Sequence, residues 1–203
     1  MKNEYMLPDA QQEKTGLSRR TFLKTVTGTV AGIGISQMFN PALVAALEKG
    51  LKTHPVLWIQ GQGCTGCSVS LLNLVDPSIA DVLLKVISLQ YHPTVMASEG
   101  ERAMENLYDI AEEYRGKFSL AIEGAIPVSA DGRYCIVGEY QHKEITMMDI
   151  VKDLGAKAGS VLAVGTCAAY GGIPAAEGNE TGATGTKSFL RSCGINTPVV
   201  NIP

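Results

Sequence analysis

The sequence has 203 residues, 45% of them hydrophobic and 18% charged, and its formal net charge is -3. This length suits one globular domain with some additional sequence. Because the charge balance is slightly acidic, the composition does not predict a basic surface for nucleic acid or for an anionic membrane.

The first 46 residues are interpreted as a leader. They contain the run LSRRTFLK at 17–24, followed by a mildly apolar stretch at 26–35. A pair of arginines, a Phe two residues later and a Lys before an apolar run are typical of a twin-arginine export signal. A cytosolic basic turn before an Ala/Gly helix is the alternative. The apolar stretch is shorter than a membrane span requires. We therefore predict a signal peptide at 1–46, cut near Val44-Ala45-Ala46, and a periplasmic protein.

From His54 onward, short apolar runs alternate with helical patterns. Five runs are predicted to be strands: 56–60, 86–90, 118–122, 161–164 and 198–202. Near-continuous apolar strands separated by helices indicate a parallel sheet that is covered on both faces. We expect residues 47–203 to form a flavodoxin-like, doubly wound α/β domain.

Two of the intervening helices have clear patterns. The first is predicted to begin with a Ser98-x-x-Glu101 capping box and to reach Gly116. Its inward face is predicted to consist of Ala103, Leu107, Ile110, Ala111 and Tyr114. The second is predicted from Glu144 to Ala158, with an inward face of Met148, Val151 and Leu154. The stretch at 128–142 is expected to be an inserted turn and strand.

The chain has five cysteines, namely Cys64, Cys67, Cys135, Cys167 and Cys193. An odd number that includes a Cys-x-x-Cys pair favours metal or redox chemistry over a disulfide framework. Cys64 and Cys67 follow the first predicted strand, and Cys167 follows the fourth. Because the carboxyl ends of parallel strands share one edge of the sheet, these three thiols are predicted to converge there. Cys135 and Cys193 are expected to be packing residues.

The chemistry of such a site has several interpretations. A lone Cys-x-x-Cys pair also occurs in ordinary loops and in thioredoxin-like dithiols. Three thiolates suit zinc as well as an iron-sulfur cluster. The glycines beside Cys64, Cys67 and Cys167 favour a bulky inorganic ligand, because they let the backbone approach it closely.

Four segments resemble the small subunit of nickel-iron hydrogenases. They are LWIQGQGCTGCSVS at 57–70, ISLQYHPTVMA at 87–97, EGAIP at 123–127 and GTCAAYGG at 165–172. The likeness covers essentially the whole chain. It is closest to the nickel-iron-selenium type, through Gly61-Gln62-Gly63 and the run IPAAEGN at 173–179. Many relatives have an acidic residue in place of Gly63.

The resemblance implies a cofactor and its ligands. Cys64, Cys67 and Cys167 correspond to three of the four ligands of a proximal 4Fe-4S cluster. The fourth ligand is expected in a Gly-Cys-Pro segment beyond Pro203, and the later domain with the medial and distal clusters is absent from this sequence. Oxygen-tolerant relatives have extra cysteines at the positions of Gly66 and Gly172, so an ordinary cubane is expected here.

The resemblance also implies partners and a function. The chain is expected to be the electron-transfer small subunit of a hydrogenase. The nickel-iron site would lie in a large subunit that forms a heterodimer with it, and an external carrier such as a cytochrome would exchange electrons. Membrane association is compatible with this reading, and nucleic acid is not an expected partner. Glu123 is interpreted as a turn or interface residue rather than part of a proton path, and His92 as a turn residue. The alternatives are a quinone-linked iron-sulfur subunit and a zinc-stabilised module.

Overall fold

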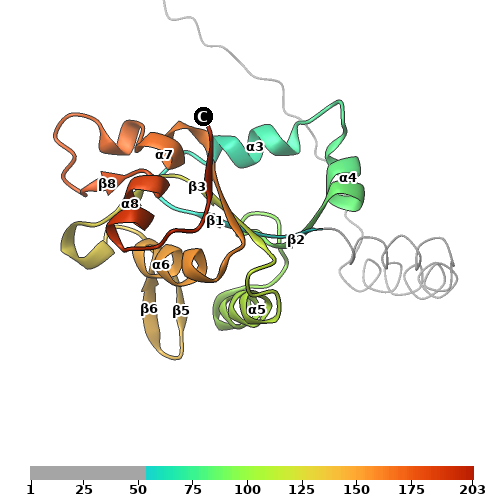
Figure 1. Ribbon diagram of the computed structural model, residues 1–203, viewed down its shortest axis with the longest axis horizontal. Coiled ribbons are helices and arrows are strands. Elements are labelled where there is room, and N and C mark those ends of the chain that lie inside the picture. Colours follow the sequence, from blue (N-terminus) through green and yellow to red (C-terminus); the bar gives the residue numbers. More distant parts are fainter. Residues whose placement is uncertain (1–53) are drawn as a thin grey trace, which may run out of the picture. The chain divides into compact units, whose positions relative to one another are not determined.

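The structure is a computed structural model that describes residues 54–203 (Figure 1). The predicted signal peptide and its boundary at residue 46 lie outside these described residues. Within the described part of the chain, no helix has the length and apolar character needed to cross a membrane.

A five-stranded parallel sheet forms the centre of this unit. Its strands are β1 (His54–Gln60), β2 (Ile87–Tyr91), β3 (Ser119–Glu123), β7 (Ser160–Val164) and β9 (Val199–Ile202). They lie in the order β2-β1-β3-β7-β9, and every neighbouring pair is parallel. Numbered as they occur in the chain, these strands follow the order 2-1-3-4-5 of flavodoxin-like folds. The five predicted strands are confirmed, with small differences at their ends.

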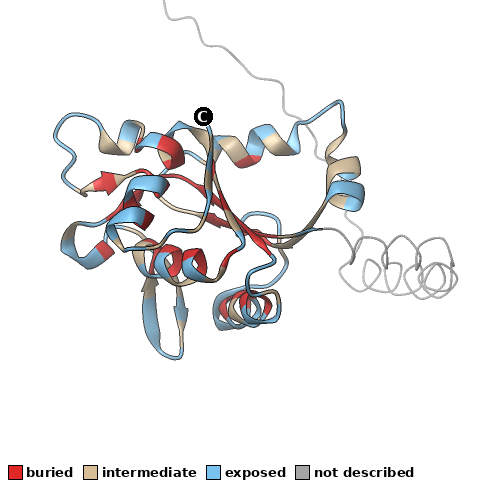
Figure 2. Cartoon of the chain, in the orientation of Figure 1, coloured by how far each residue is buried: buried red, intermediate tan, exposed pale blue. Residues whose placement is uncertain are grey.

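The sheet separates two hydrophobic clusters because successive side chains of a strand point to opposite faces. The larger cluster includes Leu57 and Ile59 of β1 and packs beneath α5 (Gly100–Glu113), α6 (Met147–Lys157) and α8 (Thr186–Ser192). The smaller cluster consists of Val56, Trp58 and Ala121, with Leu71 of α3 (Gly66–Leu72) packed against it. Figure 1 shows α3 on the opposite side of the sheet from α5 and α6, and Figure 2 shows buried positions along β1 and β3 and on α5 and α6.

Short elements complete the described unit. They are α4 (Ile79–Asp81), the π-helix η1 (Val82–Val86), β4 (Ile126–Pro127), the 3-10 turn η2 (Ser129–Gly132), β5 (Ile136–Tyr140), β6 (Lys143–Thr146), α7 (Gly165–Tyr170), the 3-10 turn η3 (Ile173–Ala175) and β8 (Ala183–Thr184). β4 pairs with β8, and β5 forms an antiparallel hairpin with β6. The predicted insertion at 128–142 therefore holds the first strand of this hairpin.

The predicted capping box of the first helix is wrong. Helix α5 begins at Gly100, and no side chain caps its N-terminus. Instead, Glu101 Oε1 accepts a hydrogen bond from the backbone N–H of Gln141, 3.2 Å away in the β5–β6 hairpin. The Glu101 side chain, which the capping box requires, thus forms a hydrogen bond with a residue distant in sequence. The inward face is confirmed, because Ala103, Leu107, Ile110 and Ala111 are buried and Tyr114 packs against the core.

The second helix begins later than predicted. Residues 143–146 form β6, so α6 begins at Met147. Thr146 caps it, since its hydroxyl accepts a hydrogen bond of 3.1 Å from the backbone N–H of Asp149. Val151 and Leu154 are buried as predicted. Met148 is only partly buried, whereas Met147 is fully buried.

Candidate functional site

The three predicted thiols occupy the carboxyl edge of the sheet. Cys64 lies in the turn after β1, Cys67 in the first turn of α3, and Cys167 in α7, directly after β7. Burial raises the pKa of the Cys67 thiol, and the nearby charges of Glu123, Cys64 and Cys167 raise it further. The thiols therefore lie close enough to influence one another, and a positively charged ligand would relieve the repulsion between their thiolates.

Each of these thiols lies against a glycine. A Cβ at Gly66 would be 3.0 Å from Cys64 Sγ, and a Cβ at Gly172 would be 2.7 Å from Cys167 Sγ. A Cβ at Gly165 would overlap Cys67 Sγ. Gly165 has φ +82° and Gly172 φ +53°, a region that favours glycine. Each sulfur atom therefore lies close to the backbone of a glycine, as the glycine-rich sequence predicted.

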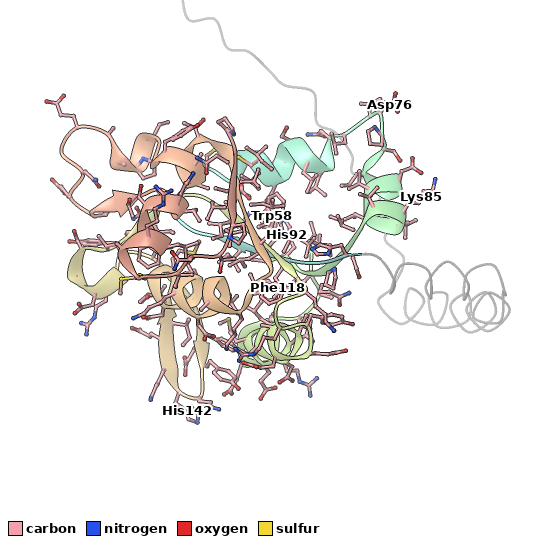
Figure 3. The ribbon with its side chains drawn as sticks, viewed as in Figure 1. Trp58, Asp76, Lys85, His92, Phe118 and His142 are labelled. Atoms are coloured by element: carbon pink, nitrogen blue, oxygen red, sulfur yellow. The ribbon has the colours of Figure 1, made fainter. Side chains whose placement is uncertain are left out.

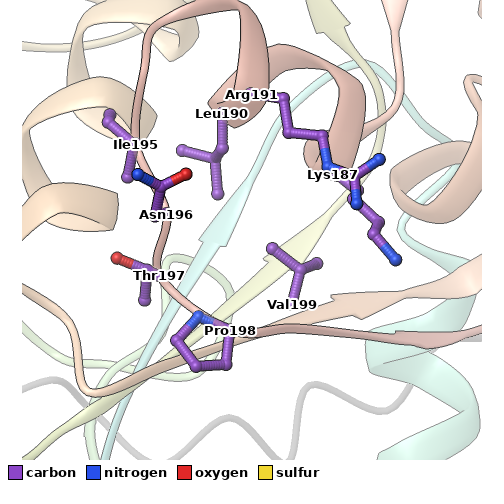
Figure 4. Close-up of a pocket in the computed structure, with 8 residues that line it drawn as sticks. All are labelled: Lys187, Leu190, Arg191, Ile195, Asn196, Thr197, Pro198 and Val199. Atoms are coloured by element: carbon purple, nitrogen blue, oxygen red, sulfur yellow. The ribbon is translucent and has the colours of Figure 1, made fainter.

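An apolar groove of about 550 Å³ opens beside Cys67. Its lining includes Trp58, Leu71, Leu162, Val164 and Ile202. A second pocket, of about 320 Å³, lies between α8 and the start of β9 (Figure 4). Its lining includes Lys187 and Arg191 but no cysteine, so it is separate from the predicted site.

Glu123, at the end of β3, is a buried carboxylate beneath the first turn of α3. Its side chain is only 3% exposed, and Oε1 accepts hydrogen bonds from the backbone N–H groups of Cys67 (3.0 Å) and Ser68 (3.1 Å). Oε2 accepts from Trp58 Nε1 (3.1 Å), Gln60 Nε2 (2.9 Å) and the Ser68 hydroxyl. Burial raises the pKa of Glu123, but the hydrogen bonds from Ser68, Gln60 and Trp58 outweigh it and leave the pKa lowered.

The interpretation of Glu123 as a turn or interface residue is therefore wrong for this chain: the side chain is directed inward, onto the helix that carries Cys67. The interpretation of His92 as a simple turn residue also needs correction. His92 is 3% exposed, and its ring stacks on Trp58 at 5.2 Å between centroids (Figure 3). Burial lowers the pKa of His92, against the opposing influence of Glu123.

Sequence reasoning missed Ser68, Trp58 and Gln60 as members of this site. Two signals could have found part of it. Glu123 is the one charged residue that follows the apolar run at 118–122, and a buried carboxylate requires several donors. Trp58 and Gln60 are two residues apart in β1, so their side chains point to the same face of the sheet.

The other two cysteines lie elsewhere. Cys135 and Cys193 both pack against the larger hydrophobic cluster, and burial raises the pKa of Cys135. Their interpretation as packing residues is confirmed. All five cysteines are free thiols.

The three thiols come from separate parts of the chain, and each lies against a glycine. Among residues 54–203, no three His, Cys, Asp or Glu side chains are placed to share a single metal ion. Each iron of a 4Fe-4S cluster takes its own thiolate. Cys64, Cys67 and Cys167 come from three separate elements around glycine-lined backbone, so they could hold three irons of such a cluster.

Comparison with known proteins gives the family. A family model described as NADH ubiquinone oxidoreductase, 20 Kd subunit, matches residues 64–203, which include the three thiols. The chain belongs to this family. That description names a quinone-linked enzyme, which was one of the alternatives, whereas the similar proteins below carry hydrogenase names.

The relatives refine this assignment. The periplasmic NiFeSe hydrogenase small subunit of Desulfomicrobium baculatum is 55% identical over 192 residues, which cover 92% of this chain and 61% of that protein. The periplasmic NiFe hydrogenase small subunit 1 of Nitratidesulfovibrio vulgaris is 38% identical over 183 residues, covering 90% of this chain and 56% of that protein. The likeness to hydrogenase small subunits, with the NiFeSe type among them, is thus confirmed.

A solved structure agrees. The recombinant NiFeSe hydrogenase from Desulfovibrio vulgaris Hildenborough matches with a TM-score of 0.74 and 67% identity, covering 75% of this chain and 54% of that chain. The chain therefore spans between half and two thirds of the length of these relatives.

Proposed function

We propose that this chain is the N-terminal, cluster-binding part of the small subunit of a periplasmic nickel-iron(-selenium) hydrogenase. It would relay electrons between an H2-activating large subunit and an external carrier such as a cytochrome. The observation that carries the proposal is the set of three thiols at one sheet edge, each against a glycine, in a chain that is 55% identical to a NiFeSe hydrogenase small subunit.

In this proposal, Cys64, Cys67 and Cys167 hold three irons of a proximal 4Fe-4S cluster. The cluster supplies one-electron storage when bound, and the protein supplies the ligands and glycine-lined backbone beside them. Trp58, Leu71 and Leu162 line the apolar groove that adjoins Cys67. The fourth ligand is proposed to come from a Gly-Cys-Pro segment beyond Pro203, and the nickel-iron site to lie in the large subunit.

The large subunit is proposed to dock over the edge of the sheet that carries the thiols. Large apolar side chains stand exposed on both sides of it: Val69 of α3 is 52% exposed, Tyr170 of α7 64% and Ile173 of η3 88%. Exposed apolar groups gathered around a site are typical of a surface that a partner covers. Twin-arginine export of the 1–46 leader remains part of the proposal, and membrane association is compatible with it.

Iron and sulfide analysis after anaerobic reconstitution tests the function. The protein extended through the next Gly-Cys segment is expected to bind about four irons at this site, and the 203-residue chain to hold a labile cluster. Replacing Cys64, Cys67 or Cys167 by Ser should abolish stable binding, whereas Cys135→Ser and Cys193→Ser are the matched controls. Full binding in all three site variants would contradict the proposal.

The same preparation separates the alternative functions. A zinc-stabilised module would be colourless and contain zinc without sulfide. Purification with a nickel-containing large subunit favours the hydrogenase, and a quinone-reducing complex without nickel would favour the quinone-linked alternative. Hydrogen exchange in residues 61–70 should slow when the large subunit binds. Protection confined to the opposite edge of the sheet would contradict the docking surface.

A further inference from the structure

Behind Cys67 lies a buried network of polar side chains that the relay function does not explain. Ser68, His92 and Glu123 are 0%, 3% and 3% exposed, and they come from α3, the end of β2 and the end of β3. We propose that Ser68 and His92 are positioning residues: they hold the Glu123 carboxylate against the first turn of α3 and so fix the direction from which Cys67 reaches its cluster. This inference rests on the proposed function of Cys67 as a ligand.

The Ser68 hydroxyl uses its full hydrogen-bonding capacity. It donates to Glu123 Oε2, and it accepts from Gln60 Nε2 at 2.8 Å and from His92 Nε2 at 3.1 Å. A hydroxyl has one donor and two acceptor sites, so no capacity is left over. Such a fully satisfied buried network fixes the orientation of each of its members.

The contacts of His92 determine the direction of these hydrogen bonds. The backbone N–H of Thr94 donates to His92 Nδ1 at 3.1 Å, so Nδ1 is an acceptor and the ring proton lies on Nε2. Nε2–H therefore donates to Ser68, and the only proton of the Ser68 hydroxyl is directed to Glu123. Stacking on Trp58 holds the imidazole plane in place.

Glu123 connects this hydrogen-bond network to the backbone of Cys67. The first N–H groups of a helix have no partner within the helix. Here, the N–H groups of Cys67 and Ser68 both donate to Glu123 Oε1, while Trp58 and Gln60 of β1 donate to Oε2. Residues at the ends of β2, β1 and β3 thus hold α3 in place through the Glu123 carboxylate, and α3 carries the Cys67 thiol.

Four substitutions test the positioning role. Ser68→Ala removes the bridging hydroxyl, and His92→Phe keeps a ring on Trp58 but removes both nitrogens. His92→Gln is the conservative variant, because its amide can still donate to Ser68. His142→Phe is the matched control, because the His142 side chain is 94% exposed on the β5–β6 hairpin.

The first measurement is amide hydrogen exchange of the 203-residue chain without metal. In Ser68→Ala and His92→Phe, exchange at the amides of Cys67 and Ser68 should become about tenfold faster, as expected when hydrogen bonds to a charged acceptor are weakened. In His92→Gln it should stay within about threefold of wild type, and in His142→Phe it should not change. Unchanged exchange in the first two variants would overturn the proposal, as would an equal increase throughout α5.

The second measurement is the rate at which reconstituted protein releases iron to a chelator. Ser68→Ala and His92→Phe should release iron several times faster than wild type, and His92→Gln should restore slow release. Equal release in all variants, despite faster amide exchange, would overturn the link to the cluster. This measurement uses the protein extended through the next Gly-Cys segment. If its wild-type form binds no iron, the proposed function fails, whereas amide exchange still decides whether the network positions α3.

Discussion

The two groups of cysteines in this chain lie in different surroundings. Burial raises the pKa of both Cys67 and Cys135, so burial alone does not distinguish them. Cys67 also has two other thiols and a carboxylate nearby, and its sulfur lies against Gly165. Cys135, by contrast, packs against the larger hydrophobic cluster. The comparison teaches that the charges and the backbone around a cysteine, more than its burial, decide whether it is placed to bind metal.

Among the substitutions considered, the one at Gly165 should have the largest effect on the surroundings of Cys67. A Cβ at Gly165 would overlap Cys67 Sγ, and its φ of +82° is strained for alanine. In the protein extended through the next Gly-Cys segment, Gly165→Ala is expected to abolish stable iron binding. It should also lower the free energy of unfolding by about 2–3 kcal/mol, from strain and overpacking together. Iron content and urea unfolding measure the two effects.

Gly178→Ala is the matched control. Gly178 also has a positive φ, +94°, but a Cβ there would meet nothing within 4 Å. Gly178→Ala should lower the free energy of unfolding only by the backbone strain, about 1–2 kcal/mol, and should leave iron binding intact. If both variants lose iron equally, the close approach of Gly165 to Cys67 is not what matters at this site.

The sequence was sufficient to predict the sheet and the thiols. The five strands are apolar runs bounded by polar or glycine-rich segments, and parallel topology then brings Cys64, Cys67 and Cys167 to one edge. The glycines beside them correctly indicated close backbone approach. These features depend on local pattern and on general rules of topology, which a single sequence contains.

What could not be predicted depends on contacts between distant residues. Glu101 was expected to complete a capping box but instead bonds to Gln141 in the hairpin. The start of α6 was placed too early because the pairing of β6 with β5 has no strong local signal. Glu123 and His92 were read from their neighbours in sequence, whereas their roles come from Ser68 and Trp58, 55 and 34 residues away in the chain.

A moderate effect is expected at the ion pairs that connect α6 with α5. Lys157 of α6 is only 15% exposed and bonds to Asp153 and to Glu112 of α5, at 2.8 Å each, and its ammonium lies 5.9 Å from the centre of the Tyr108 ring. Lys157→Met should lower the free energy of unfolding by about 1 kcal/mol. Iron content should not change, because the partners of Lys157 lie on α5 and α6 rather than on the elements that carry the thiols.

The exposed pair Lys85–Asp81 is the control for this variant. The Lys85 side chain is 67% exposed, so Lys85→Met should cost less than about 0.5 kcal/mol. Chemical unfolding of both variants measures the difference. Loss of iron in Lys157→Met would show that the two regions are more tightly coupled than their separate packing indicates.

The smallest effect concerns the pH dependence of stability at the network behind Cys67. The pKa of His92 lies below its ordinary value of 6.5, chiefly because of burial. As the pH falls below 6.5, the unfolded chain takes up a proton at this position before the folded chain does, so the free energy of unfolding decreases until the pKa of the folded state is passed. The corresponding loss from Glu123, whose pKa is also lowered, begins only below its ordinary value of 4.5.

Chemical unfolding at pH 7 and pH 5 measures this effect, followed by the fluorescence of Trp58, the one tryptophan of the chain. The free energy of unfolding of wild type should be lower at pH 5 than at pH 7. This decrease should be smaller in His92→Phe, and in His142→Phe it should equal that of wild type. If His92→Phe keeps the full decrease, the proton that destabilises the fold binds elsewhere, and the burial of His92 is not what makes stability depend on pH in this range.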